Sequence, residues 1–100
     1  MRRIFKVTEN IPRNFQYSLG DQLRRAALSI VNNIAEGSGK ISQKEKAQFY
    51  RIALNSAWEC IPMLTLLKEE RLCEGNQMEE LREQCIHICN MLGRLIGAIQ

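Results

Sequence analysis

Apolar residues recur every three or four positions along most of the chain, a spacing typical of amphipathic α-helices rather than of strands. The 100 residues include only two prolines and six glycines, so the connections between helices are expected to be short. We predict one all-α domain over residues 1–100, an up-and-down antiparallel four-helix bundle with a short first helix. The predicted helices cover about residues 1–10, 17–36, 42–73 and 77–99.

The second and fourth predicted helices carry the most regular apolar stripes. Each stripe advances by three or four residues and therefore follows one face of its helix. In the second helix the stripe consists of Leu19, Leu23, Ala26, Ala27, Ile30 and Ile34. In the fourth helix it consists of Met78, Leu81, Cys85, Ile88, Leu92, Leu95 and Ile99. The alternating steps of three and four in the fourth helix indicate a heptad seam suited to bundle packing.

Turn-forming residues separate the predicted helices. Gly37 and Gly39 predict a left-handed C-cap at the end of the second helix. Ser42 and Glu45 have the spacing of a capping box that opens the third helix, and we expect Asn76 to cap the start of the fourth. The sequence GSGK follows a helix rather than a strand, so we interpret it as a helix end and linker and not as a phosphate-binding loop.

The third helix has more apolar positions than one small bundle can bury. Its predicted core stripe is Phe49, Ile52, Ala53, Ser56, Cys60, Met63, Leu64 and Leu67. A second band, displaced around the helix, contains Tyr50, Leu54, Ala57, Trp58 and Ile61. Exposed apolar surface of this kind marks interfaces, although burial under loops or scattered exposure is the alternative. The predicted homo-oligomer interface consists of Leu28, Val31, Tyr50, Leu54, Trp58 and Ile61. Pro62 lies inside the same helix and predicts a kink or a break.

The whole chain has a formal net charge of +3, and its positive charge is concentrated in the first part. Residues 1–58 contain ten Lys or Arg and four Asp or Glu, whereas residues 59–100 contain four and seven. This distribution favours contact between one basic face and a polyanion; the alternative is an ordinary solvated face balanced by the acidic second part. The residues predicted to contact nucleic acid are Arg24, Arg25, Lys40, Lys44 and Arg51.

The sequence contains no arrangement typical of an enzyme or of a cofactor site. It has no Walker loop, dinucleotide fingerprint or HExxH motif, and its single histidine has no catalytic partner at a recognisable spacing. We therefore predict no enzymatic activity and no cofactor. Two pairs of polar residues, each with a spacing of three, lie on the second and third helices. An acid–base cluster would explain them, but we interpret them as a structural polar network between these helices. They are Asn33, Glu36, Ser56 and Glu59.

The four cysteines are Cys60, Cys73, Cys85 and Cys89. Cys85 and Cys89 lie one helical turn apart with His87 between them, which raises the alternative of a metal site or a thiol enzyme. A rotation of about 100° per residue turns His87 away from both thiols, so we interpret the cysteines as reduced core residues and predict no bound metal. The chain has neither the apolar core of a signal peptide nor a membrane-spanning stretch, which predicts a cytoplasmic location without membrane contact.

Two segments carry a family resemblance: LGDQLRRAALSIVNNIAEGSGKISQKE, residues 19–45, and FYRIALNSAWE, residues 49–59. They closely resemble the bacterial four-helix-bundle family that includes the intervening-sequence protein of large-subunit ribosomal RNA genes and the accessory protein of diversity-generating retroelements. The family's aromatic pair falls on Phe49 and Tyr50. Residues 4–12, IFKVTENIP, resemble the end of the family's first helix, which indicates a member with a shortened first helix.

The resemblance implies a closed homo-oligomer, typically a pentameric ring, and a non-catalytic role as a nucleic-acid-binding accessory protein. The partners that it implies are structured RNA, DNA in an RNA:DNA intermediate, and a reverse transcriptase. The alternative is a protein–protein interaction scaffold with no nucleic-acid role, in which Tyr50, Leu54 and Trp58 dock a different protein and the charges only confer solubility. A shared fold does not decide between these two functions.

Overall fold

The computed structural model describes residues 2–9, 19–69 and 75–99, and every element within them is helical. Helix α1 spans Arg2–Glu9, α2 spans Asp21–Ser38, α3 spans Gln43–Glu69 and α4 spans Gly75–Ile99. Positions 19 and 20 are also helical and lead directly into α2. The four predicted helices are therefore confirmed; their expected bounds at residues 1, 10, 17 and 73 lie outside the described residues.

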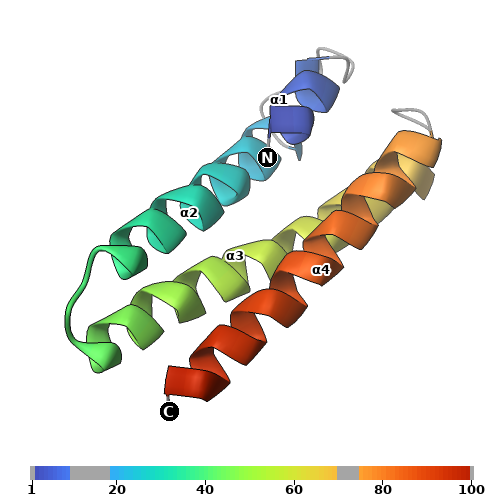
Figure 1. Cartoon of the computed structure of the whole chain (residues 1–100). Helices are drawn as coiled ribbons and strands as arrows, with labels where there is room; N and C mark the ends of the chain where they lie inside the picture. The colour runs from blue at the N-terminus through green and yellow to red at the C-terminus, as the bar shows by residue number, and fades with distance from the viewer. Residues whose placement is uncertain (1, 10–18, 70–74, 100) are drawn as a thin grey trace.

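Helix α3 is the central element of the bundle. It packs against α2 on one side and against α4 on the other, and neighbouring helices in this series run antiparallel (Figure 1). The short α1 packs on α2 and α4 at the end far from the α2–α3 hinge, whereas the C-terminus lies at the hinge end (Figure 1). The elongated shape, 43 × 21 × 17 Å, follows from α3, whose 27 residues span about 40 Å.

The predicted stripe of α2 is confirmed, but the stripe of α4 is not a strict heptad seam. Leu95, predicted to be core, is 44% exposed, and Ile96 is 9% exposed in its place. Cys89 is buried as well, so the buried positions advance at close to 3.6 residues per turn. A strict heptad repeat drifts around a straight helix by about 20° every seven residues. Leu95, near the end of the stripe, therefore lies outside the core.

The division of α3 into a core stripe and a second band is partly wrong. Tyr50 and Ala57, assigned to the second band, are buried, whereas Ile52 of the predicted core stripe is exposed. The reason is that α3 contacts two neighbouring helices rather than one, so its buried face is wide. Several buried positions of α3 have small side chains, and Ala53, Ala57 and Cys60 are all fully buried.

The helix ends differ from the glycine prediction. Helix α2 continues through Gly37 to Ser38, and its cap residue Gly39 has φ −83° and ψ −7°, so the predicted left-handed C-cap is absent at both glycines. The Gly39 N–H donates to the carbonyls of residues 35 and 36 at 3.2 Å and closes the helix with right-handed geometry. The predicted N-cap of α3 is present, because the Glu45 N–H donates to Ser42 Oγ at 3.3 Å.

Gly37 is required by a close approach between helices and not by its backbone angles. A Cβ at this position would lie 2.7 Å from Cε1 of Tyr50 and 3.2 Å from Cβ of Phe49. The missing side chain therefore admits the Tyr50 ring against the backbone of α2. The Tyr50 hydroxyl lies 3.4 Å from Ser38 Oγ, and Lys46 Nζ donates to the Ser38 carbonyl at 3.3 Å, so polar contacts surround the same joint.

Two further expectations about the helices are corrected: a break at Pro62 and a helix start at Asn76. Helix α3 runs without a break through Pro62. Pro62 is exposed, and the buried Cys60 and Leu64 on either side hold the helix in place. Helix α4 already includes Gly75, so Asn76 lies inside the helix and does not begin it.

We expect Gly37→Ala to lower the free energy of unfolding by about 1–3 kcal/mol, because the new methyl group displaces the buried Tyr50 ring or separates α2 from α3. Gly93→Ala is the matched control, since a Cβ there meets nothing within 4 Å inside α4. This control should raise the free energy of unfolding by about 0.5–1 kcal/mol through helix propensity. Denaturant titration followed by circular dichroism measures both; equal stabilisation by the two changes would contradict the close approach.

Candidate nucleic-acid interface

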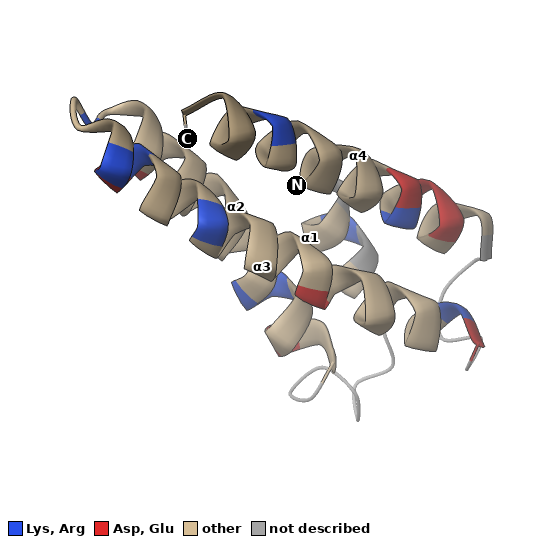
Figure 2. Ribbon diagram, turned by 90° about the horizontal axis from the view of Figure 1, so that it is seen from below, with Lys and Arg blue, Asp and Glu red and all other residues tan. Residues whose placement is uncertain are grey.

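The hinge end of the bundle carries cations without counter-charges. Lys44, Arg51 and Arg94 are exposed, and none of them forms an ion pair within the described part of the chain. Arg51 follows Tyr50, and Arg94 lies between Leu92 and Ile96 of the same core cluster, so α3 and α4 present these cations at one level of the bundle. Figure 2 shows the basic positions at this end. We call Lys44 and Arg51, which lie seven residues apart on the outer side of α3, the basic face; Arg94 lies at the same end on α4.

The other cations predicted to contact nucleic acid have partners within the molecule. Arg25 pairs with Asp21 at 3.2 Å. Lys40 Nζ lies 4.0 Å from a Glu36 carboxylate oxygen and 5.3 Å from the centroid of the Phe49 ring. Arg24 is half-buried and also interacts within the molecule. Lys44 and Arg51 therefore lie in the part of α3 that begins at the hinge, whereas Arg24 and Arg25 lie on the first turns of α2, which begins at the other end of the bundle (Figure 1).

Acidic side chains gather at the opposite end, in the first turns of α4 (Figure 2). Glu79 accepts a hydrogen bond from Lys68 at 2.9 Å and lies 3.7 Å from Arg82. The hydrogen bond from Lys68 lowers the pKa of the Glu79 carboxyl. Glu80 and Glu83 line a shallow surface hollow of about 520 Å³ on α4. The far end also holds cations, among them Lys68 and Arg82, so its charges largely compensate one another, whereas the hinge end keeps exposed cations without ion pairs in the described part of the chain.

The predicted interface residues separate into exposed and inward-facing groups. Leu28, Val31 and Trp58 are exposed, and Trp58 is the most exposed of the three at 57%. Tyr50 is only 7% exposed and belongs to the core of the protomer, so its place in the predicted interface is corrected. Leu54 and Ile61 are half-buried and pack on the core clusters. Two exposed residues of α4 were missed, Met91 and Leu95.

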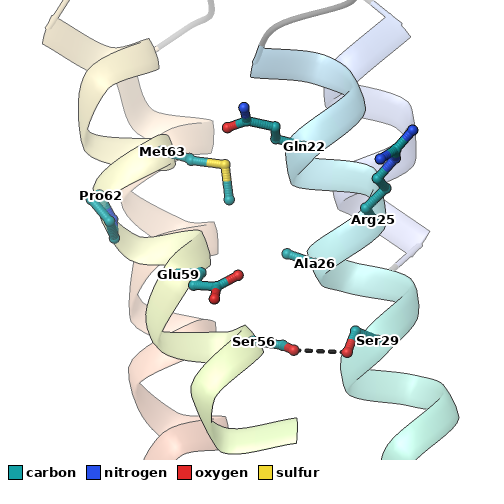
Figure 3. A pocket seen from close by; sticks show the side chains of 8 residues that line it. All are labelled: Gln22, Arg25, Ala26, Ser29, Ser56, Glu59, Pro62 and Met63. Atoms are coloured by element: carbon teal, nitrogen blue, oxygen red, sulfur yellow. Dashed lines mark hydrogen bonds between the residues drawn. The ribbon is translucent and has the colours of Figure 1, made fainter. Parts of the chain in front are cut away.

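A polar contact does tie α2 to α3, with a residue that the sequence reasoning missed. Ser56 Oγ donates to Ser29 Oγ at 2.8 Å (Figure 3). Asn33 Nδ2 lies 2.7 Å from the Ser29 carbonyl oxygen and 3.2 Å from Ser29 Oγ. Glu36 and Glu59 are exposed and take no part in these bonds. Ser29 lies four residues before Asn33 and therefore on the same helical face, so the sequence spacing could have predicted their contact.

An open groove of about 490 Å³ lies beside this contact, between α2 and α3 (Figure 3). Glu59 and Met63 point from α3 into the gap and Gln22 points from α2, whereas the Arg25 side chain extends away from Glu59 (Figure 3). The residues that line the groove do not form a catalytic triad of nucleophile, base and orienting group. The groove offers hydrogen bonds and one carboxylate, and no arrangement for covalent chemistry.

The cysteines are packed between α3 and α4. Cys60, Cys85 and Cys89 are free thiols and are buried, while His87 is exposed on another side of α4. The hydrogen bond with Cys85, together with burial, raises the pKa of the Cys60 thiol; burial likewise raises the pKa of Cys89. Cys73 lies outside the described residues. Across residues 2–9, 19–69 and 75–99, no three His, Cys, Asp or Glu side chains gather in a group that could hold a metal ion.

These features place the protein in the class of antiparallel helical bundles. Its core contains free thiols, and its surface charge is unevenly distributed. Residues 1–94 match the family model of the 23S rRNA-intervening sequence protein, and the chain belongs to this family. Comparison with curated proteins gave no match. None of the helices that the structure describes combines the length and hydrophobicity needed to cross a bilayer.

We expect Ser29→Ala and Ser56→Ala each to lower the free energy of unfolding by about 1 kcal/mol, because each leaves the other hydroxyl without its partner across the α2–α3 contact. The double variant removes both hydroxyls and should cost less than the two single changes together, by about 0.5–1.5 kcal/mol. Chemical denaturation of the four proteins measures this coupling. Strictly additive costs would show that the two serines act independently.

Proposed function

We propose that the protein is a non-catalytic accessory protein that binds structured RNA, or an RNA:DNA intermediate, on its basic face. The observation that carries this proposal is the set of uncompensated cations, Lys44, Arg51 and Arg94, at the end opposite the acidic first turns of α4. The family description names ribosomal RNA, which supports RNA over other polyanions. Binding of this kind comes mainly from phosphate contacts and depends steeply on salt.

Exposed apolar side chains support self-association as part of the same proposal. Val31 lies three residues before Ile34, and Met91 lies three residues after Ile88, so each borders a residue that packs on the core cluster of Tyr50, Ala53, Leu92 and Ile96. Leu28 and Leu95 extend these exposed strips along α2 and α4. Burial of the strips against a second copy of the chain would remove apolar surface from water.

A closed ring would repeat the basic face once in every subunit and so multiply its attraction for a polyanion. Five-fold symmetry and action beside a reverse transcriptase are the finer parts of the proposal, and they rest on the resemblance of residues 19–59 alone. A scaffold that binds only protein would also use the exposed strips, but it would leave the uncompensated cations without a role.

We expect the double change Lys44→Glu with Arg51→Glu to weaken binding to a labelled structured RNA and to reduce the slope of log affinity against log salt by about 2, one for each cation removed from the phosphates. Fluorescence anisotropy at two salt concentrations measures both quantities.

Lys6→Glu with Arg25→Glu is the matched control, because it changes the net charge equally at positions away from the basic face. The control should retain most of the affinity and the slope. Equal losses of affinity in the two double variants would mean that net charge alone drives binding, and an unchanged affinity for the first variant would refute the basic face.

For self-association, we expect Val31→Glu with Leu95→Glu to reduce the mass of the protein in solution, because charged side chains cannot be buried unpaired in an interface. Size-exclusion chromatography with light scattering measures the mass. Ile52→Glu with Leu66→Glu is the control, since it places the same charges on exposed apolar positions of α3. A mass that is the same for wild type and the first variant would contradict the proposed interface.

A further inference from the structure

Trp58 is a large aromatic side chain that is exposed to solvent on the surface of the bundle. It is 57% exposed, whereas Tyr50 is buried and Phe49 is partly covered by Lys40. Among the aromatic residues that the structure describes, Trp58 alone is more than half exposed. It is also the single tryptophan of the chain, so the intrinsic tryptophan fluorescence reports on this position.

Trp58 continues the line of cations along α3. Lys44, Arg51 and Trp58 follow one another at intervals of seven residues within one uninterrupted helix. Seven residues are close to two full turns, so each step advances about 10.5 Å along the axis and rotates by only about 20°. The three side chains therefore share the outer face of α3, with Lys44 and Arg51 leading to the exposed indole.

The exposed surface around Trp58 is mixed, because both Glu59 and Pro62, which adjoin it on α3, are exposed. Arg51, two turns before Trp58 on the helix surface, and Asn55, one turn before it, are exposed, and the apolar Leu54 and Ile61 beside it turn towards the core. Ile52, another exposed apolar residue of α3, is about 120° away around the helix. Aromatic anchors of protein interfaces lie at the centre of well-packed patches from which charged groups are depleted. Trp58 instead lies at the end of a cationic strip.

We infer that Trp58 stacks on an unpaired base of a nucleic-acid strand that runs along α3, with Arg51 and then Lys44 holding phosphates of nucleotides further along the strand. The inference rests on the proposed function and specifies its ligand as single-stranded nucleotides, in a loop of RNA or in a free strand. A flat indole gains stacking energy from any base, so the site selects for strandedness and not for sequence. Within a duplex the faces of the bases are covered by their neighbours, whereas loops and ends can turn a base outwards onto an aromatic side chain.

The assignment gives the two kinds of residue separate effects. Contacts of Lys44 and Arg51 with phosphates weaken as salt screens and competes for the charges, for single strands and duplexes alike. Stacking on Trp58 adds an interaction that salt affects little and that the duplex lacks. Preference for the single strand should therefore increase as the salt concentration rises.

The test compares wild type with Trp58→Ala and Trp58→Phe, using a labelled oligothymidylate and a duplex of the same length. We expect Trp58→Ala to weaken oligothymidylate binding by about 5- to 100-fold and to leave duplex binding within about twofold. Trp58→Phe, which keeps a stacking ring, should recover most of the affinity. Ile52→Ala, which shortens an exposed apolar side chain on another side of α3, should change neither affinity. Oligothymidylate should quench the tryptophan fluorescence of the wild type, and the duplex should not.

Other results would overturn the inference in distinguishable ways. Salt-dependent binding with no quenching, and with equal affinities for Trp58→Ala and wild type, would refute the stacking site while leaving the proposed function intact. Absence of binding to either probe at low salt would remove both. A lower solution mass for Trp58→Ala, with no selective weakening of single-strand binding, would assign the indole to a contact with a protein subunit.

Discussion

The close packing of α3 between α2 and α4 is the constraint on which the other features depend. Helix axes can approach only as far as the side chains between them allow, and α3 meets both neighbours through small residues such as Ala53, Ala57 and Cys60. Gly37 on α2 completes this arrangement by admitting the Tyr50 ring. Since two sides of α3 are occupied, one outer strip of the helix remains free. The cations and the exposed indole lie on that strip.

Periodicity in the sequence was sufficient to identify the helices and the core of α2, because one helix that faces one partner has one narrow apolar stripe. It was less informative for α4, where the heptad description selected Leu95 instead of Ile96. A repeat of 3.5 and a repeat of 3.6 residues agree over two turns and diverge over six. The difference is decided by whether the helix supercoils around its neighbours, which is a property of the assembled bundle.

The candidate site was less predictable than the fold for a related reason. The ion pair between Asp21 and Arg25 has a spacing that is visible in the sequence, but the isolation of Arg51 depends on which acids the other helices bring near it. Tyr50 and Trp58 have similar chemistry and lie eight residues apart, yet one is core and the other is exposed. Rotation by about 80° around a helix with two partners separates them, and no local pattern records where the second partner lies.

The connection between α2 and α3 is short, with residues 39–42 between the end of one helix and the start of the next. Closing so small a loop costs little chain entropy, and the Ser42 cap and the contact of Gly37 with Tyr50 lie directly beside it. Many native contacts of the α2–α3 pair are therefore close in sequence. Proteins rich in such local contacts fold quickly. The hairpin of α2 and α3 therefore has contacts that need no long loop to close before they form.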